Sequence, residues 1–270
     1  RRGEWEGPTR PGRPDFMALV DDAHLARELS ALTSRLVPLF RTDFVRRSWQ
    51  VVSGAAHIEL ALDQGHIVAG PRSEPILELE LELKRGPASA LFDVALALGR
   101  GERGQASLWL MPTDRSKAER GLALFRGQTV QPQPALTTHL TPSMDAATAL
   151  RTAASDTLVQ LQANLNGLMQ PLPAGHLPDP EFVHQARVAL RRLRAGLSLF
   201  REHLPPAFER HWRAQWKATA AVLGEARNWD VLDDRLLGWI GRRLQHGLPP
   251  DTLEPLADWV LERRRAACRS

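Results

Sequence analysis

One decapeptide, PILELELELK at residues 75–84, restricts the fold of this chain more than any other stretch. Its leucines and glutamates alternate strictly, and residues i and i+2 share a face only in an extended strand. The polar face then carries Glu78, Glu80, Glu82 and Lys84. An antiparallel sheet with one solvated face explains such a pattern. Neighbouring carboxylates repel and glutamate is a poor strand former, so the pattern also fits acids gathered to hold a divalent cation.

Further alternating segments flank this decapeptide, so the first half of the chain is predicted to contain a sheet. A Gln64-Gly65 dipeptide between two of them is a hairpin signal. Neighbouring strands add Glu59, Asp63 and Arg46 to the charges of the sheet. A sheet with acids and bases on one face suits an antiparallel barrel with a polar interior. The predicted strands are 42–53, 57–63, 66–69 and 74–84, with a further candidate at 107–111.

The second half of the chain is predicted to be entirely helical. Residues 128–143 have the composition of a linker, and the pattern after them is helical to the end of the chain. Antiparallel helices joined by short loops form a bundle. The predicted fold class is therefore α+β, with a partial antiparallel β-barrel followed by an all-α bundle. Helices are expected at 16–37, 88–98, 117–124, 228–245 and 251–267.

Four local signals set further helix boundaries in this half. Thr141-Pro142 and Asp179-Pro180 each pair a capping side chain with a proline suited to the first helical position. Pro205-Pro206 is expected to end the helix that starts at Pro180, and the next helix is expected to stop at Gly224.

The helix that starts at Pro180 has two faces of different character. Its segment HQARVALRRLRAGLSLF, residues 184–200, has an apolar stripe typical of a core-facing helix. A basic file within an arc of about 80° lies opposite, and Arg192 lies off this file and is expected to face solvent. Like charges at this spacing destabilise a helix by a few tenths of a kcal/mol per pair, so the file indicates an extended anionic partner. The file consists of His184, Arg187, Arg191 and Arg194.

Composition excludes several classes of protein. The 270 residues carry a net charge of +4 and a single cysteine, Cys268. One cysteine rules out an internal disulfide framework or a cysteine-cluster metal site, and it fits a reducing compartment. No apolar run is long enough to span a membrane. We therefore expect a cytoplasmic protein without a membrane partner.

Two sets of motifs resemble known domains. TDFVRRSW, IELALDQGHIVAG, EPILELELELKRG and SLWLMPTDRSKAERG together resemble the C-terminal half of a CYTH domain, the triphosphate tunnel fold. HQARVALRRLRAGLSLF followed by LGEARNWDVL resembles the start of a CHAD domain, a histidine-containing helical domain. The expected organisation is a CYTH-like domain at 1–127 without its first strands, a linker at 128–143, and the N-terminal half of a CHAD-like domain at 144–270.

This resemblance implies roles for particular residues. A CYTH tunnel implies hydrolysis of inorganic triphosphate with Mg²⁺ or Mn²⁺, the metal ligands being Glu78, Glu80, Glu82, Glu59 and Asp63. Phosphate contacts would come from Arg46, Lys84 and Lys117, and the expected catalytic set is Glu80, Glu82 and Lys84. A CHAD domain implies binding of inorganic polyphosphate, here through His184, Arg187, Arg191, Arg194, Lys217 and Arg227.

Two alternatives to a triphosphatase stay open. One is a binding module that holds polyphosphate without catalysis, its CYTH half being degenerate. The other is a nucleic-acid-binding protein, since arginines interleave with Trp212, Trp216 and Trp229. Tryptophans at i and i+4 more often form a core pair, and a net charge of +4 is small for a nucleic-acid-binding protein. The sequence therefore argues against nucleic acid as the partner.

Overall fold

The computed structural model describes residues 5, 7, 14–101, 107–108, 110–170, 172, 176–237 and 254–267, with the backbone alone at 235–237 and 254. The chain forms two compact units, Arg1–Leu110 with Asp114–Thr129, and Met111–Thr113 with Val130–Ser270. Among the described residues, no helix has both the length and the apolar character needed to cross a membrane.

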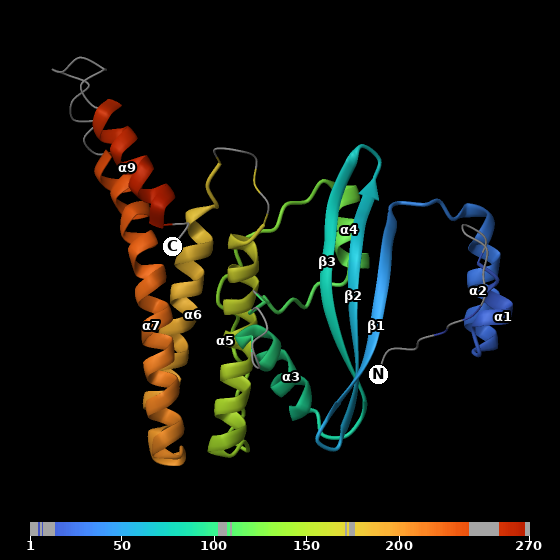
Figure 1. Ribbon diagram of the computed structural model, residues 1–270, viewed down its shortest axis with the longest axis horizontal. Coiled ribbons are helices and arrows are strands. Elements are labelled where there is room, and N and C mark those ends of the chain that lie inside the picture. The colour runs from blue at the N-terminus through green and yellow to red at the C-terminus, as the bar shows by residue number, and fades with distance from the viewer. Residues whose placement is uncertain are drawn as a thin grey trace. The chain divides into compact units, whose positions relative to one another are not determined.

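The first unit contains a three-stranded antiparallel sheet in the order β1-β2-β3 (Figure 1). Its strands are β1 (Arg41–Ser53), β2 (Ala56–Ala69) and β3 (Arg72–Arg85). Its helices are α1 (Phe16–Leu19), α2 (Ala23–Leu32), the 3₁₀ turn η1 (Thr33–Arg35), α3 (Ser89–Arg100) and α4 (Lys117–Arg126). The sheet is open within the described residues, so the closed barrel stays a prediction.

The predicted hairpin at Gln64-Gly65 is wrong. Strand β2 continues through this dipeptide, and Gly65 pairs with Phe44 on β1 and Ile76 on β3. A side chain at Gly65 would overlap the backbone of Asp43 and Phe44, so this glycine permits close approach of two strands. The hairpin turns instead use Gly54 and Gly70, both with positive φ.

Two other predictions for this unit are also corrected. The helix expected over 16–37 is broken, because Asp22 leaves helical geometry and its side chain caps α2 by accepting from the N–H groups of His24 and Leu25. The candidate strand at 107–111 is not present at residues 107–108 and 110–111. Trp109 lies outside the described residues.

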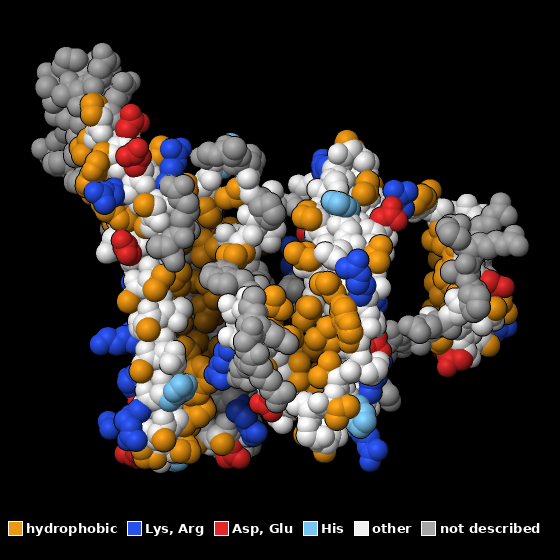
Figure 2. Space-filling view, viewed as in Figure 1, with side chains coloured by type: hydrophobic (Ala, Val, Ile, Leu, Met, Phe, Trp, Pro, Cys, Tyr) orange, Lys and Arg blue, Asp and Glu red, His pale blue; other side chains and the backbone are white. Residues whose placement is uncertain are grey.

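A different helix packs on each face of the sheet. The leucine face contributes Ile58, Leu81 and Leu83 to a cluster with Ala90 of α3, while the rest of this face leaves apolar side chains exposed (Figure 2). Helix α4 packs on the opposite, charged face. It begins with a capping box between Ser116 and Glu119.

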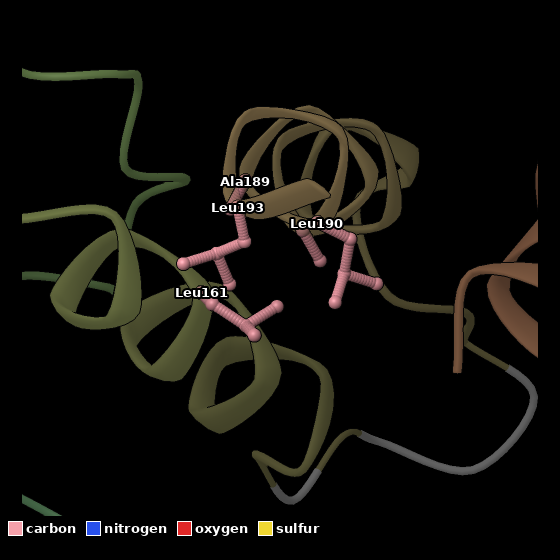
Figure 3. Close-up of a cluster of buried hydrophobic side chains, with 5 residues drawn as sticks. Leu161, Ala189, Leu190 and Leu193 are labelled. Carbon is pink, nitrogen blue, oxygen red and sulfur yellow. The ribbon is translucent and has the colours of Figure 1, made fainter. Parts of the chain in front are cut away.

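The second unit is a helical bundle, as predicted. It contains α5 (Ala146–Leu168), α6 (Pro180–Leu199), the 3₁₀ turn η3 (Arg201–His203), α7 (Pro206–Val231), the π-helical turn η4 (Leu232–Leu237) and α9 (Glu254–Ala267). Its core joins Leu161 of α5 to Ala186, Ala189, Leu190 and Leu193 of α6 (Figure 3). The apolar stripe of α6 is therefore confirmed as its core face.

Helix boundaries in the bundle differ from prediction at Thr141-Pro142 and at Gly224. Asp179 caps α6 with Pro180 in its first turn, as expected. Helix α5 starts after Asp145 rather than Thr141. Gly224 does not end α7, which continues to Val231. Of the helices predicted at 228–245 and 251–267, residues 238–245 and 251–253 lie outside the described part.

Residues in the middle of the predicted linker pack onto the bundle. The side-chain amide of Asn164, which is fully buried, donates to the carbonyl of Gln133 and accepts from its N–H, at 2.9 and 3.0 Å. Arg192, expected to face solvent, donates instead to Gln160 and to the carbonyl of Leu136. These bonds anchor an extended segment, because buried backbone groups need partners.

Candidate functional site

Charged residues of all three strands meet on the α4-covered face of the sheet. The register places Arg46 opposite Asp63, and Asp63 opposite Glu78. Glu80 follows Glu78 on the same face of β3 because side chains alternate along a strand. Strand pairing and alternation therefore bring the acids of two strands beside a cation of the third.

Asp63 is the buried centre of this arrangement, with an exposed fraction of 0%. Arg46 donates to both of its carboxylate oxygens at 2.7 Å and to Glu80 at 2.5 Å. The hydrogen bond from Arg46, followed by interactions with Lys117, outweighs burial and lowers the pKa of Asp63 to about 2. The carboxylates of Asp63 and Glu80 raise the pKa of Arg46, so Asp63 and Arg46 are both ionised at neutral pH.

Lys117 projects from the first residue of α4 into the acids. Its Nζ lies 2.8 Å from Asp63 Oδ2, 2.7 Å from Glu78 Oε2 and 2.6 Å from Glu80 Oε1. Burial lowers the pKa of Lys117, but hydrogen bonds to these three acids outweigh it and raise the pKa above its ordinary value. The ring of Phe44 lies 5.3 Å from the ammonium, within cation–π range.

Arg120 is a site residue that the sequence interpretation missed. It donates to Glu74 at 2.7 Å, to the carbonyl of Pro75 at 2.7 Å and to Glu78 Oε1. The available signal was its position three residues after Lys117, which places both side chains on one face of α4. Its partners lie more than forty positions away in the sequence, so only the tertiary structure identifies them.

Three of the predicted site residues lie apart from this centre. Lys84 pairs with Glu82 at 2.7 Å and with Glu59 at 3.4 Å, further along the same face of the sheet. Gln50 of β1 donates to Glu59 at 3.4 Å. The structure thus divides the predicted acids into an inner group with Asp63 and an outer group around Lys84.

The inner group fits a divalent cation. Asp63, Glu78 and Glu80 each offer one carboxylate oxygen, and these oxygens lie within 4.8 Å of one another. Carboxylate oxygens are the ligands that Mg²⁺ and Mn²⁺ favour. Each acid also bonds to an arginine, Asp63 and Glu80 to Arg46 and Glu78 to Arg120. These bonds hold the carboxylates in place, as outer partners do around metal ligands.

The predicted basic residues of the second unit lie along α6 and α7. Arg187 donates to the carbonyl of Ala220 at 2.7 Å, and a side chain at Gly224 would lie 2.8 Å from Arg187 Nη1. The Nε of Arg194 is buried without a hydrogen-bond partner. Arg191 is exposed. Figure 2 shows basic side chains along α7, to which Lys217 and Arg227 belong.

Acids in the bundle pair with other arginines. Glu209 binds Arg213, and Asp230 binds Arg264 at 2.7 Å. Asp230 lies three residues after Arg227 on α7, but the ion pair it forms is with Arg264 of α9. Within the described part of the bundle, none of the predicted polyphosphate-binding arginines forms an ion pair with a carboxylate.

Comparisons with known proteins agree with both resemblances. Residues 1–102 match the model of the CYTH domain and residues 152–270 that of the CHAD domain. A curated relative described as an inorganic triphosphatase, from Haemophilus influenzae, is 49% identical over 61 residues. That match covers 23% of this chain and 17% of the relative. This chain therefore matches less than a fifth of the relative's length.

Proposed function

Because the chain joins a CYTH domain to a CHAD domain, we propose that its first unit hydrolyses inorganic triphosphate with Mg²⁺ or Mn²⁺. The observation that carries the proposal is the convergence of Asp63, Glu78 and Glu80 on one point, with Arg46 and Lys117 beside them. Acids that hold a cation and bases that hold phosphate are the two requirements of phosphoanhydride hydrolysis. The triphosphatase relative supports this substrate class.

In this proposal the three inner acids hold the cation, which supplies neutralisation of phosphate charge when bound. Arg46 and Arg120 hold those acids in position. Arg46 is also 43% exposed, and Lys84 is 42% exposed on the same face. Arg46 of β1 and Lys84 of β3 lie on one face of the sheet and would contact different phosphates of a linear substrate. They stabilise the charge that develops on the transferred phosphoryl group and on the leaving pyrophosphate.

The test is phosphate release from tripolyphosphate by the full chain, with Mg²⁺ or Mn²⁺ and with a chelator. We expect turnover that the chelator abolishes and that E78Q and E80Q each reduce at least a hundredfold, because each substitution removes a metal ligand. E202Q removes an exposed glutamate from the bundle and serves as the control. A folded chain with no metal-dependent turnover would refute the proposal.

We further propose that the helical unit binds inorganic polyphosphate. The supporting observation is that Arg187, Arg191 and Arg194 line one face of α6 without carboxylate partners in the described bundle. His184, Lys217 and Arg227 would extend this surface. A chain of phosphates can meet successive helical turns, which relieves the repulsion within the file.

The triple variant R187A/R191A/R194A tests this second function. Polyphosphate affinity should fall at least thirtyfold while helical content by circular dichroism is retained. A charge-matched control removes Arg126, Arg151 and Arg263, which are exposed outside the basic file, and should lose much less affinity. Competition with single-stranded DNA at matched ionic strength separates polyphosphate from nucleic acid. Equal binding by the triple variant and the parent would contradict the proposal.

A further inference from the structure

The ammonium of Lys117 lies at the point where the three inner acids converge. One oxygen from each of Asp63, Glu78 and Glu80 is 2.6–2.8 Å from Nζ. Each of these acids offers one ligand atom to the candidate metal cluster. The lysine therefore binds the same three carboxylates that a metal ion at this cluster would use.

Two cations cannot occupy this position together. Mg²⁺ binds oxygen at about 2.0–2.1 Å, so an ion among the same oxygens would lie against the ammonium and repel it. The side chain of Lys117 is 15% exposed and starts from the first residue of α4. It can therefore leave by rotation about its own flexible stem, without unfolding of the helix.

The acids do not depend on Lys117 alone for their positions. Arg46 bonds to Asp63 and Glu80, and Arg120 bonds to Glu78 and Glu74. These arginines remain when the lysine moves, so the cluster keeps its shape for an incoming ion.

We propose that Lys117 is an internal counter-ion, which balances the inner acids in the metal-free protein and is displaced by the divalent cation. The inference rests on the proposed metal-dependent function of the same site. Replacement of a single positive charge by a double one, with the lysine kept nearby, makes the site more positive. The displaced ammonium is then free to contact a substrate phosphate, so metal binding prepares the site for a polyanion.

Titration of the full chain with Mn²⁺ tests the exchange, by calorimetry and by the electron paramagnetic resonance signal of free Mn²⁺. K117M removes the competing cation and should bind Mn²⁺ at least tenfold more tightly than the parent. K117R keeps a positive charge and should not gain affinity. R126M removes a charge from the last turn of the same helix, outside the described contacts of the acids, and should bind Mn²⁺ within threefold of the parent.

Thermal unfolding provides an independent readout. Without metal, K117M should melt below the parent, because three neighbouring carboxylates lose a shared counter-ion. Saturating Mn²⁺ should raise its melting temperature by more than it raises that of the parent. K117Q keeps hydrogen-bond donors without the charge, and it replaces K117M if the latter does not fold.

The outcomes separate this inference from the proposed function. Equal or weaker Mn²⁺ binding by both neutral variants, with the parent binding Mn²⁺ and hydrolysing tripolyphosphate, would overturn the exchange alone. Failure of the parent and of both neutral variants to bind Mn²⁺ would overturn the metal site and the exchange together. Tighter binding by a neutral variant, combined with weaker affinity for tripolyphosphate in saturating Mn²⁺, is the result we expect.

Discussion

Asp63 shows how a single buried charge depends on its partners. Its carboxylate has no exposed surface, yet the pKa is lowered because Arg46 and then Lys117 favour the ionised form. Removal of one partner of a buried ion pair leaves an uncompensated charge, which costs far more than an exposed pair contributes. The sheet therefore tolerates this acid only as part of the cluster.

The lowered pKa of Asp63 predicts acid sensitivity. The carboxylate has an ordinary pKa of 3.8 when unfolded and about 2 when folded, so the unfolded state binds a proton first as the pH falls. Its contribution, about 2 kcal/mol, is fully present above about pH 5 and is lost between about pH 4 and pH 2. Urea unfolding at several pH values should show a steeper decline over this window for the parent than for D63N. Identical slopes for the parent and D63N would contradict the lowered pKa of Asp63.

Two glycines of the bundle predict opposite effects of alanine. Gly196 lines an apolar cavity of about 440 Å³, and an added Cβ would lie 3.7 Å from Leu150. G196A should stabilise the bundle by about 0.5–1 kcal/mol because alanine favours the helix. Gly167 of α5 lies against the ring of Phe182, which an added Cβ would overlap, so G167A should destabilise it by about 1–3 kcal/mol. Urea unfolding monitored by circular dichroism measures both changes.

At the scale of elements, α4 determines whether the acids have their counter-ions. Gly121 packs directly against the ring of Phe40. Arg72 of β3 donates to the carbonyls of Leu124 and Phe125 at the end of the helix, at 3.1 and 3.2 Å, where a cation is favourable. Contacts at the middle and at the C-terminal end of α4 thus set the depth at which its first residue reaches the sheet.

This docking predicts that G121A affects the site at a distance. The added methyl group would overlap Phe40 and displace α4. Lys117 and Arg120 belong to this helix, so their contacts with the acids would be lost or weakened. Hydrolysis of tripolyphosphate should fall at least tenfold with little change in the far-ultraviolet circular dichroism spectrum. A118S, at an exposed position of the same helix, is the control and should retain activity. Full activity of G121A would show that the position of α4 is unimportant.

At the scale of the whole molecule, the chain is two units with different ligands proposed for each. The first unit gathers carboxylates on a sheet, and the second presents arginines on a helix. Opposite charges suit opposite ligands, a divalent cation in one unit and a phosphate chain in the other.

We therefore predict that each ligand stabilises only one unit, Mn²⁺ the first unit and polyphosphate the bundle. In calorimetry, Mn²⁺ at a hundred times its dissociation constant should stabilise the first unit by about 2.7 kcal/mol and leave the bundle transition in place. Polyphosphate should do the reverse. The double variant E78Q/E80Q should abolish the Mn²⁺ effect and keep the polyphosphate effect. A shift of both transitions by either ligand would show that the units do not respond separately.

Local patterns explain which predictions succeeded. Alternation in PILELELELK correctly placed Glu78 and Glu80 on one face of β3, and Asp179-Pro180 correctly marked the start of α6. Both signals depend on residues close in sequence. Gly65 and Gly224 were misread because a glycine has the same local signature in a turn as in the middle of an element. Their neighbours in space, Phe44 and Arg187, explain why each is small.

The sequence by itself determined that a sheet precedes a helical bundle, which faces of β3 and α6 are charged, and the family resemblance, because side-chain period acts over a few residues. Only the tertiary structure decided which charges meet. Register and the docking of α4 bring Asp63, Glu78, Glu80 and Lys117 within hydrogen-bond distance, while Glu59 and Glu82 stay with Lys84. Coulomb energies depend on distances of a few ångströms, and those distances arise from contacts between segments that are far apart in the chain.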